Sequence, residues 1–197
     1  MSKSYNPKAV WNLNYDWFDQ SNPISELFWK NKILDFDKIK SISKRFMNNN
    51  LKKFPEFESI KVDSKILLVL PPYNISLVEF IKNFKNKLDS SEKFREKFQS
   101  CDFVLIKQHR IAHYDFPDSF TISSKKVLTL NSELSKILPA EVILFAYPNI
   151  VLFSAPSSAM FTRMDIDVFK FNSFNSENKK DYGFIYHRAI RNGMQFL

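Results

Sequence analysis

The sequence predicts an α+β domain, built as a mostly antiparallel sheet with helices packed on one face. The expected elements come in the order helix, strand, helix, several strands and a final helix, and such a grouping is typical of α+β folds. With 197 residues and 44% hydrophobic content, the chain is long enough for one sizeable core. We therefore expect an N-terminal arm and helical extension over residues 1–50 and one domain over residues 51–197.

The first 50 residues predict an arm followed by two helices. Residues 1–21 are aromatic and polar without a helical or strand period, which indicates an extended arm. A helix is expected to start at Asn22 and Pro23, because proline is favoured at the first helical position. A second helix is expected from about Asp37, and it carries three apolar positions: Ile39, Ile42 and Phe46.

The strongest helix signal of the chain follows a predicted strand. Residues 57–70 read as this strand, which ends at two prolines that cannot continue a ladder. Ser76 and Glu79 then have the spacing of a capping box. Apolar residues recur behind it at spacings of three and four, namely Leu77, Ile81, Phe84 and Leu88. Residues 91–99 are expected to extend this helix, with Phe94 and Phe98 facing inward.

The second half of the chain predicts mainly strands. Residues 103–109 and 120–130 read as two strands joined by a loop with Pro117 and Asp118 at its tip, so we expect a basic β-hairpin there. A short helix is expected over residues 132–138. Further strands are expected at residues 142–147, 150–153 and 164–171, and a helix at residues 177–191.

Composition narrows the function to a few classes. The chain has 29 Lys and Arg against 21 Asp and Glu, and this net charge of +8 favours a polyanionic partner. Its two glycines, Gly183 and Gly193, do not suffice for a glycine-rich phosphate-binding loop, which excludes most nucleotide-dependent enzymes. A single cysteine, Cys101, excludes an internal disulfide and a thiolate metal site and favours a reducing compartment. No apolar run reaches the length of a membrane span.

The predicted hairpin is the candidate RNA-binding surface. Lysines on it supply charge for phosphates, and histidine and tyrosine rings are available to stack on exposed bases. The alternative is a solvated strand edge that lysines protect against aggregation. The candidate RNA-binding residues are Lys107, His109, Arg110, His113, Tyr114, Lys125, Lys126 and Thr129.

Several segments resemble, in the same order along the chain, those of the large-subunit ribosomal protein five family, whose members contact 5S rRNA. The strand entry resembles the family's first strand at Pro55, Phe57, Glu58, Ile60 and Val62. The loop region resembles its long loop at Ile111, Ala112, Tyr114, Phe120, Ile122 and Lys125. Later segments are similar at residues 127–130, 138–139, 149–153, 164–166 and 193–196.

This resemblance implies a structural protein of the central protuberance that binds 5S rRNA or neighbouring large-subunit rRNA. It also implies a loop that reaches toward P-site tRNA and the small-subunit head, contacts with other large-subunit proteins, no cofactor and no catalytic activity. The 21 phenylalanines, together with abundant Lys, Asn, Ile and Ser, have AT-rich codons and favour an organellar genome. The expected location is therefore the mitochondrial ribosome.

Three other interpretations remain open from the residues alone. His109 and His113 lie four apart and could hold a zinc ion, although no third ligand follows nearby. Asp165 and Asp167 form a D-x-D pair of the kind with which nucleotidyl or glycosyl transferases hold a divalent cation. The basic surface also fits an accessory subunit of an organellar membrane complex that faces anionic lipid.

Overall fold

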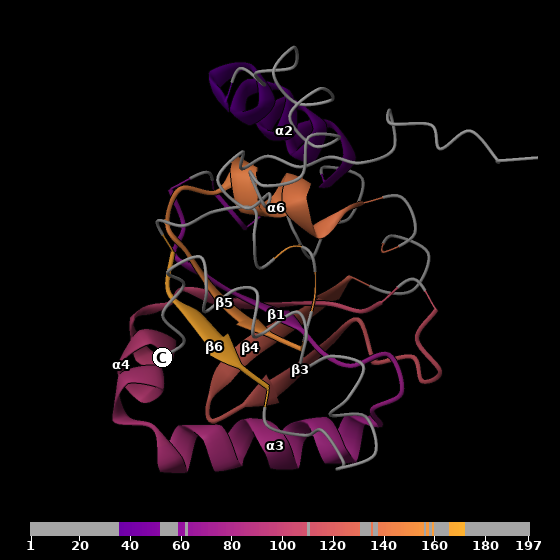
Figure 1. Cartoon of the computed structure of the whole chain (residues 1–197), viewed down its shortest axis with the longest axis vertical. Coiled ribbons are helices and arrows are strands. Elements are labelled where there is room, and N and C mark those ends of the chain that lie inside the picture. Colours follow the sequence, from indigo (N-terminus) through magenta and orange to yellow (C-terminus); the bar gives the residue numbers. More distant parts are fainter. Residues whose placement is uncertain are drawn as a thin grey trace, which may run out of the picture.

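The computed structural model of the chain describes residues 36–51, 59–61, 63–109, 111–130, 135, 138–155, 157, 159 and 166–171. Helices and a six-stranded sheet together build this part, so the predicted α+β class is confirmed (Figure 1). The strands are β1 (Ile66–Leu70), β2 (Phe103–Lys107), β3 (Ser119–Ile122), β4 (Lys125–Leu130), β5 (Ile150–Ser154) and β6 (Val168–Lys170). The helices are α2 (Phe36–Leu51), α3 (Leu77–Ser90), α4 (Glu92–Ser100) and α6 (Ala140–Ala146).

The sheet is mostly parallel, so the predicted antiparallel arrangement is wrong. Its strand order is β3-β4-β2-β1-β5-β6, and only β3 runs antiparallel to its neighbour β4. Parallel strands need long crossover connections: α3 with α4 joins β1 to its neighbour β2, and the segment with α6 joins β4 to β5 across the sheet. The five residues of β1 are all buried, as expected for a central strand covered on both faces.

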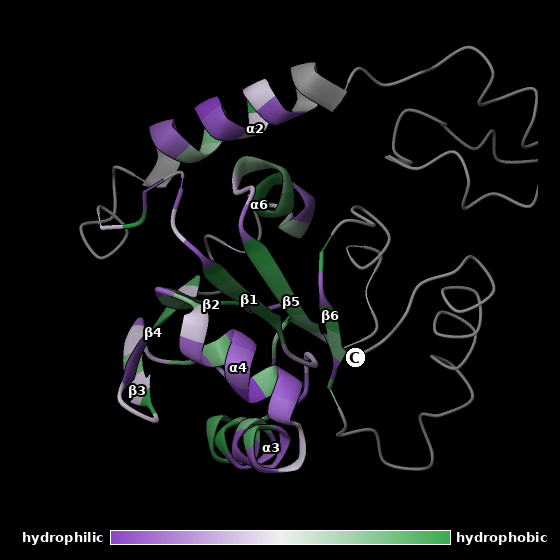
Figure 2. Cartoon of the chain, turned by 90° about the vertical axis from the view of Figure 1, so that its left-hand side faces the viewer, coloured by the Kyte–Doolittle hydropathy of each residue, from purple (hydrophilic) through white to green (hydrophobic). Residues whose placement is uncertain are grey.

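Helices cover both faces of the sheet, so the predicted packing on one face is also wrong. In Figure 2, α2 and α6 lie on one side of the strands and α3 and α4 on the other. Side chains of β1 alternate between the two cores: Ile66 and Leu68 belong to the cluster under α6, and Leu67 and Val69 to the cluster under α3. The sequence did not reveal this because a strand buried on both faces lacks a polar side.

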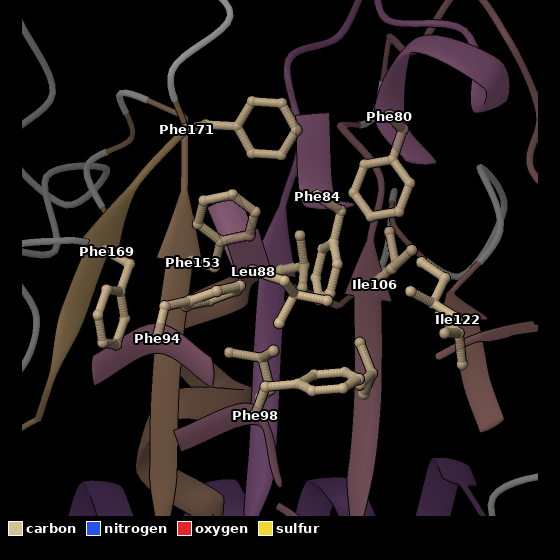
Figure 3. Close-up of a cluster of buried hydrophobic side chains, with 14 of the residues drawn as sticks. Phe80, Phe84, Leu88, Phe94, Phe98, Ile106, Ile122, Phe153, Phe169 and Phe171 are labelled. Carbon is tan, nitrogen blue, oxygen red and sulfur yellow. The ribbon is translucent and has the colours of Figure 1, made fainter. Parts of the chain in front are cut away.

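The core under α3 and α4 is built largely from phenylalanine rings. Figure 3 shows rings from both helices meeting rings from β5 and β6. Phe84 is fully buried, and its ring centroid lies 5.4 Å from that of Phe94 and 5.7 Å from that of Phe153. Phe94 also meets Phe169 at 5.0 Å. Such tilted and edge-on pairs contribute stability beyond the area that they bury.

Several predicted elements have other bounds or another structure. Residues 59–61 and 63–65 are not strand, because Ser64 closes a turn with Lys61, and the strand starts at Ile66. The segment predicted to extend α3 over residues 91–99 is instead a separate helix, α4 (Glu92–Ser100), in which Phe94 and Phe98 are buried as predicted. Residues 142–146 are helical instead of extended. The helices predicted from Asn22 and over 177–191 lie outside the described residues, as does most of 132–138.

Helix α2 spans the predicted boundary at residue 50 and packs on the domain. Of the side chains described on this helix, Ser43 and Met47 are buried, and Met47 joins the core cluster under α6. The apolar residues Ile42 and Phe46 are instead 48% and 36% exposed. Two of the three apolar positions of the predicted helix are therefore exposed, and Met47 supplies the buried contact instead.

The capping box of α3 is present as predicted. The backbone N–H of Glu79 donates to Oγ of Ser76, and the backbone N–H of Ser76 donates to Oε2 of Glu79 at 3.1 Å. Hydrogen bonds from Ser76 hold the pKa of the Glu79 carboxyl below its ordinary value of 4.5. The helix N-terminus is thus closed by the chain's own carboxylate.

Replacing Ser76 with Ala is expected to lower the free energy of unfolding by about 1 kcal/mol, because the backbone N–H of Glu79 loses its acceptor. Part of the loss is expected to depend on pH, because Oγ of Ser76 also donates to the Glu79 carboxylate at 2.9 Å, whereas the backbone N–H that donates to it remains in the variant. A carboxyl with a depressed pKa stabilises the fold above its unfolded value and stops doing so as the pH falls through the folded value. Urea unfolding should therefore show a difference between Ser76→Ala and the parent protein at neutral pH that shrinks in acid. A constant difference at all pH values would contradict this coupling.

Candidate nucleic-acid interface

The parallel pairing of β2 and β4 separates the candidate RNA-binding residues into two groups. Lys107 ends β2 and lies opposite Leu130, the last residue of β4, whereas Lys125 begins β4. At about 3.3 Å per residue, the two ends of β4 are roughly 17 Å apart. The expected hairpin between residues 103–109 and 120–130 is therefore wrong, because the antiparallel partner of β4 is β3. That hairpin closes through Ser123 and Ser124, both at positive φ (46° and 67°).

Aromatic rings gather where β1 and β2 end, at the carboxyl edge of the sheet. Tyr73 follows β1, and its ring lies 5.2 Å from the ring of His113 and 6.2 Å from that of His109. The backbone N–H of His113 donates to the carbonyl of Tyr73 at 2.8 Å, which ties the two loops together. His109 and His113 are exposed, and Tyr114 is 52% exposed. We call Tyr73, His109, His113 and Tyr114 the carboxyl-edge cluster.

A buried glutamine fixes the loop that carries these rings. Gln108 is 2% exposed, and its Nε2 donates to the carbonyl of Tyr114 at 2.6 Å. Its Oε1 accepts the backbone N–H of Phe116 at 3.1 Å. Phe116 is buried, with its ring 5.3 Å from that of Phe80 on α3. The side-chain amide of Gln108 and the buried ring of Phe116 thus anchor the loop to the core. This anchoring preorganises the loop residues between Gln108 and Phe116.

Among the described residues of the carboxyl edge, Lys107 is the one lysine or arginine. The ammonium group of Lys107 donates to the carbonyls of Gln108 and Ser135, both at 3.4 Å. Asp115 and Asp118 on the same loop are exposed carboxylates. Arg110, the other basic residue predicted for this surface, lies outside the described residues. In the described part of this edge, RNA binding would therefore depend mainly on aromatic contacts.

Lysines gather instead at the amino edge of the sheet. Lys61 and Lys65 precede β1, and Lys126 stands at the start of β4; all three are exposed. The backbone N–H of Lys65 donates to Oδ2 of Asp102 at 2.8 Å, which joins the loop before β1 to the one before β2. We call Lys61, Lys65 and Lys126 the basic edge.

Lys125 and Thr129 make contacts within the fold instead of facing a partner. The ammonium group of Lys125 donates to the carbonyl of Gln99 at 2.8 Å and to that of Cys101, and it lies 5.4 Å from the ring centroid of Phe98. It therefore satisfies carbonyls at the C-terminus of α4. Thr129 is 2% exposed, and its Oγ1 has no hydrogen-bond partner among the described residues. Thr129 precedes the last residue of β4 near the carboxyl edge, but its burial keeps its side chain from contacting RNA.

Cys101 lies at the end of α4 and is 3% exposed. Burial raises the pKa of its thiol to about 11, since the charged thiolate is disfavoured away from water. We expect the folded protein to react with iodoacetamide at pH 8 at least about tenfold more slowly than the urea-unfolded protein, because the thiolate is the nucleophile. Mass spectrometry of the alkylated fraction with time measures this. Equal rates in the two states would contradict the burial of this thiol.

The other candidate sites receive little structural support. Among the described residues, no three or more His, Cys, Asp and Glu side chains form a group that could hold a metal. Oδ2 of Asp167 lies 2.6 Å from the ammonium nitrogen of Lys97, while Asp165 is outside the described residues. The N-terminus of α3, where a phosphate could bind, already holds the Glu79 carboxylate. In the described part of the chain, no helix combines the length and apolar character needed to cross a membrane.

Sequence reasoning found most of the cluster but missed Tyr73, Lys61 and Lys65. The signal for Tyr73 was available: it follows Pro71 and Pro72 directly after a buried strand, and residues at that position lie at the carboxyl edge once the strands are parallel. Lys61 and Lys65 could not be found, because the predicted strand covered their turn. Comparison of the chain with protein-family models, with curated proteins and with solved structures gives no match.

Proposed function

We propose that the protein is a structural constituent of a large ribosomal subunit and binds rRNA. The carboxyl-edge cluster carries this proposal: four aromatic side chains on two joined loops, one of which is fixed by the buried Gln108. Rings held in this way can stack on exposed bases without a large ordering cost. The basic edge and the net charge of +8 support it by supplying attraction for phosphates.

The proposed setting is the central protuberance of a mitochondrial ribosome, as the sequence resemblance implies. The rRNA there would be 5S rRNA or neighbouring large-subunit rRNA, and other large-subunit proteins would be neighbours. The loop after β2 would be the part of the chain that faces P-site tRNA and the small-subunit head. In this role the protein acts as a scaffold and performs no chemistry.

The test is the identity of the RNA that accompanies the native protein. Purification of the tagged protein from its organelle, followed by sequencing of the bound RNA, is expected to recover large-subunit rRNA. Ultraviolet crosslinks are expected at Tyr73, His113 and Tyr114, because these rings would contact bases directly. Sedimentation of the protein away from the large subunit, without RNA, would overturn the proposal.

The same preparation distinguishes the transferase alternative. Under the proposed function, Asp165→Ala with Asp167→Ala leaves the association with rRNA intact. Under the alternative, the double variant removes a divalent-dependent activity. The ion pair between Asp167 and Lys97 assigns that carboxylate a role in holding α4 against the segment before β6.

A further inference from the structure

In its described residues, the carboxyl edge combines aromatic rings that could stack on bases with less positive charge than a duplex-binding surface needs. Over the described residues of 71–79, 107–118 and 155–159, the charged side chains are Glu79, Lys107, Asp115 and Asp118. The one lysine among them donates to two backbone carbonyls. A double helix presents closely spaced phosphates, and proteins that bind it neutralise several of them with Lys or Arg. Arg110 stands in the same loop of the sequence but outside the described residues, and even with it the segment has two cations against three carboxylates, so it is poorly suited to that task.

Large apolar and aromatic side chains are exposed at the same edge. Two exposed residues of the loop after β2, Ile111 at 58% and Tyr114 at 52%, accompany the rings of Tyr73 and His113. The interplanar angle of 80° between Tyr73 and His113 orients these rings in different directions. In an A-form duplex the base faces are stacked inside the helix, whereas unpaired bases can be splayed out onto aromatic side chains. Rings exposed on a fixed loop can use their faces only with unpaired bases.

We infer that the carboxyl-edge cluster takes the unpaired bases of single-stranded RNA by stacking, while the basic edge supplies the electrostatic part of binding from the opposite end of the sheet. The inference rests on the proposed function. It adds the class of RNA and assigns base stacking to one edge of the sheet and phosphate contacts to the other. Stacking contributes about 1–3 kcal/mol per base and is largely independent of salt, whereas phosphate contacts release counterions and weaken as salt rises.

The division predicts two separable effects. The triple variant Tyr73→Ala, His113→Ala and Tyr114→Ala is expected to weaken single-strand binding by about 10- to 100-fold with little change in the salt dependence. The triple variant Lys61→Ala, Lys65→Ala and Lys126→Ala is expected to reduce the slope of log affinity against log salt, by roughly 0.7 for each phosphate that the variant no longer neutralises. Tyr114→Phe keeps the ring and should bind as the parent protein does.

The experiment uses the full chain and an RNA of mixed sequence of about 12 nucleotides, within the site sizes typical of single-strand-binding domains. Affinity is measured by fluorescence anisotropy between about 50 and 200 mM salt, for the single strand and for the same strand annealed to its complement. The single strand is expected to bind at least about tenfold more tightly, which corresponds to one stacked base. A matched lysine variant on the outer side of α3 and α4, with Lys82, Lys85 and Lys93 replaced by Ala, should change the salt slope less than the basic-edge variant does.

Two results would count against the inference in distinguishable ways. Equal or tighter binding of the duplex, with no effect of the ring variant, would overturn the single-strand inference and leave RNA binding itself in place. Binding of neither form would overturn both this inference and the proposed function. Urea midpoints of all variants establish that weaker binding does not come from unfolding, since these side chains lie at the surface or at its border.

Discussion

Replacing Phe84 with Ala is expected to lower the free energy of unfolding by about 3–5 kcal/mol. The ring is fully buried and meets four other rings, those of Phe80, Phe94, Phe98 and Phe153, at centroid distances of 5.8, 5.4, 5.5 and 5.7 Å (Figure 3). Because these neighbours come from α3, α4 and β5, they cannot all move into the space left by the ring. A cavity therefore remains, and its cost adds to that of the missing burial.

Urea unfolding measures this effect, and Val78→Ala is the matched control. Val78 lies on the same helix but is 78% exposed, so its truncation is expected to change the free energy of unfolding by less than about 0.5 kcal/mol. The slope of the free energy against urea should stay the same in both variants if the unfolded states are alike. A shift for Phe84→Ala as small as that for Val78→Ala would show that the phenylalanine cluster does not hold the helices on the sheet.

The sequence predicts the parts of this fold that depend on local signals. The capping box at Ser76 and Glu79 and the inward positions Phe84, Leu88, Phe94 and Phe98 are as expected, because side-chain spacing on a helix determines them. Strands β2, β4 and β5 were also expected near their observed positions. These elements need no knowledge of their neighbours.

Strand direction and layer order depend on distant contacts, and here the predictions were wrong. Residues 103–109 and 120–130 are two strand-like runs with a loop between them. This pattern fits a hairpin, and it fits equally well the observed arrangement, in which β2 and β4 are parallel and the short β3 pairs antiparallel with β4. The apolar segment 142–146 is too short for its period to separate helix from strand, and only its place over the sheet makes it a helix. The site was divided for the same reason: reversing one strand moves Lys125 and Lys126 to the opposite edge.

Replacing Gln108 with Leu is expected to destabilise the protein by about 2–4 kcal/mol and to weaken single-strand RNA binding about tenfold. Leucine fills a similar volume but leaves the backbone N–H of Phe116 and the carbonyl of Tyr114 without their hydrogen-bond partner. Each such group costs about 1–3 kcal/mol when it is buried. RNA binding weakens because the loop must then be ordered at the moment of binding. Gln99→Leu on the exposed side of α4 is the control, with little change expected in either property.

Gln108→Glu separates the two hydrogen bonds through pH. At neutral pH the carboxylate still accepts from Phe116, but it faces the Tyr114 carbonyl without a proton to donate, and burial disfavours its charge. The folded state therefore raises the pKa of this carboxyl above its unfolded value of about 4.3. Stability is then fully retained below the unfolded value and lost as the pH rises from there through the higher folded pKa, so this variant should gain stability relative to the parent protein as the pH is lowered. Urea midpoints of both proteins from neutral pH to about pH 4 measure this, and a constant difference would mean that the Tyr114 carbonyl does not need the donor. Lowering the pH increases the positive charge of the parent protein and of the variant alike. If the variant recovers RNA binding relative to the parent protein as it recovers stability, binding therefore depends on the fixed loop and not on the overall charge.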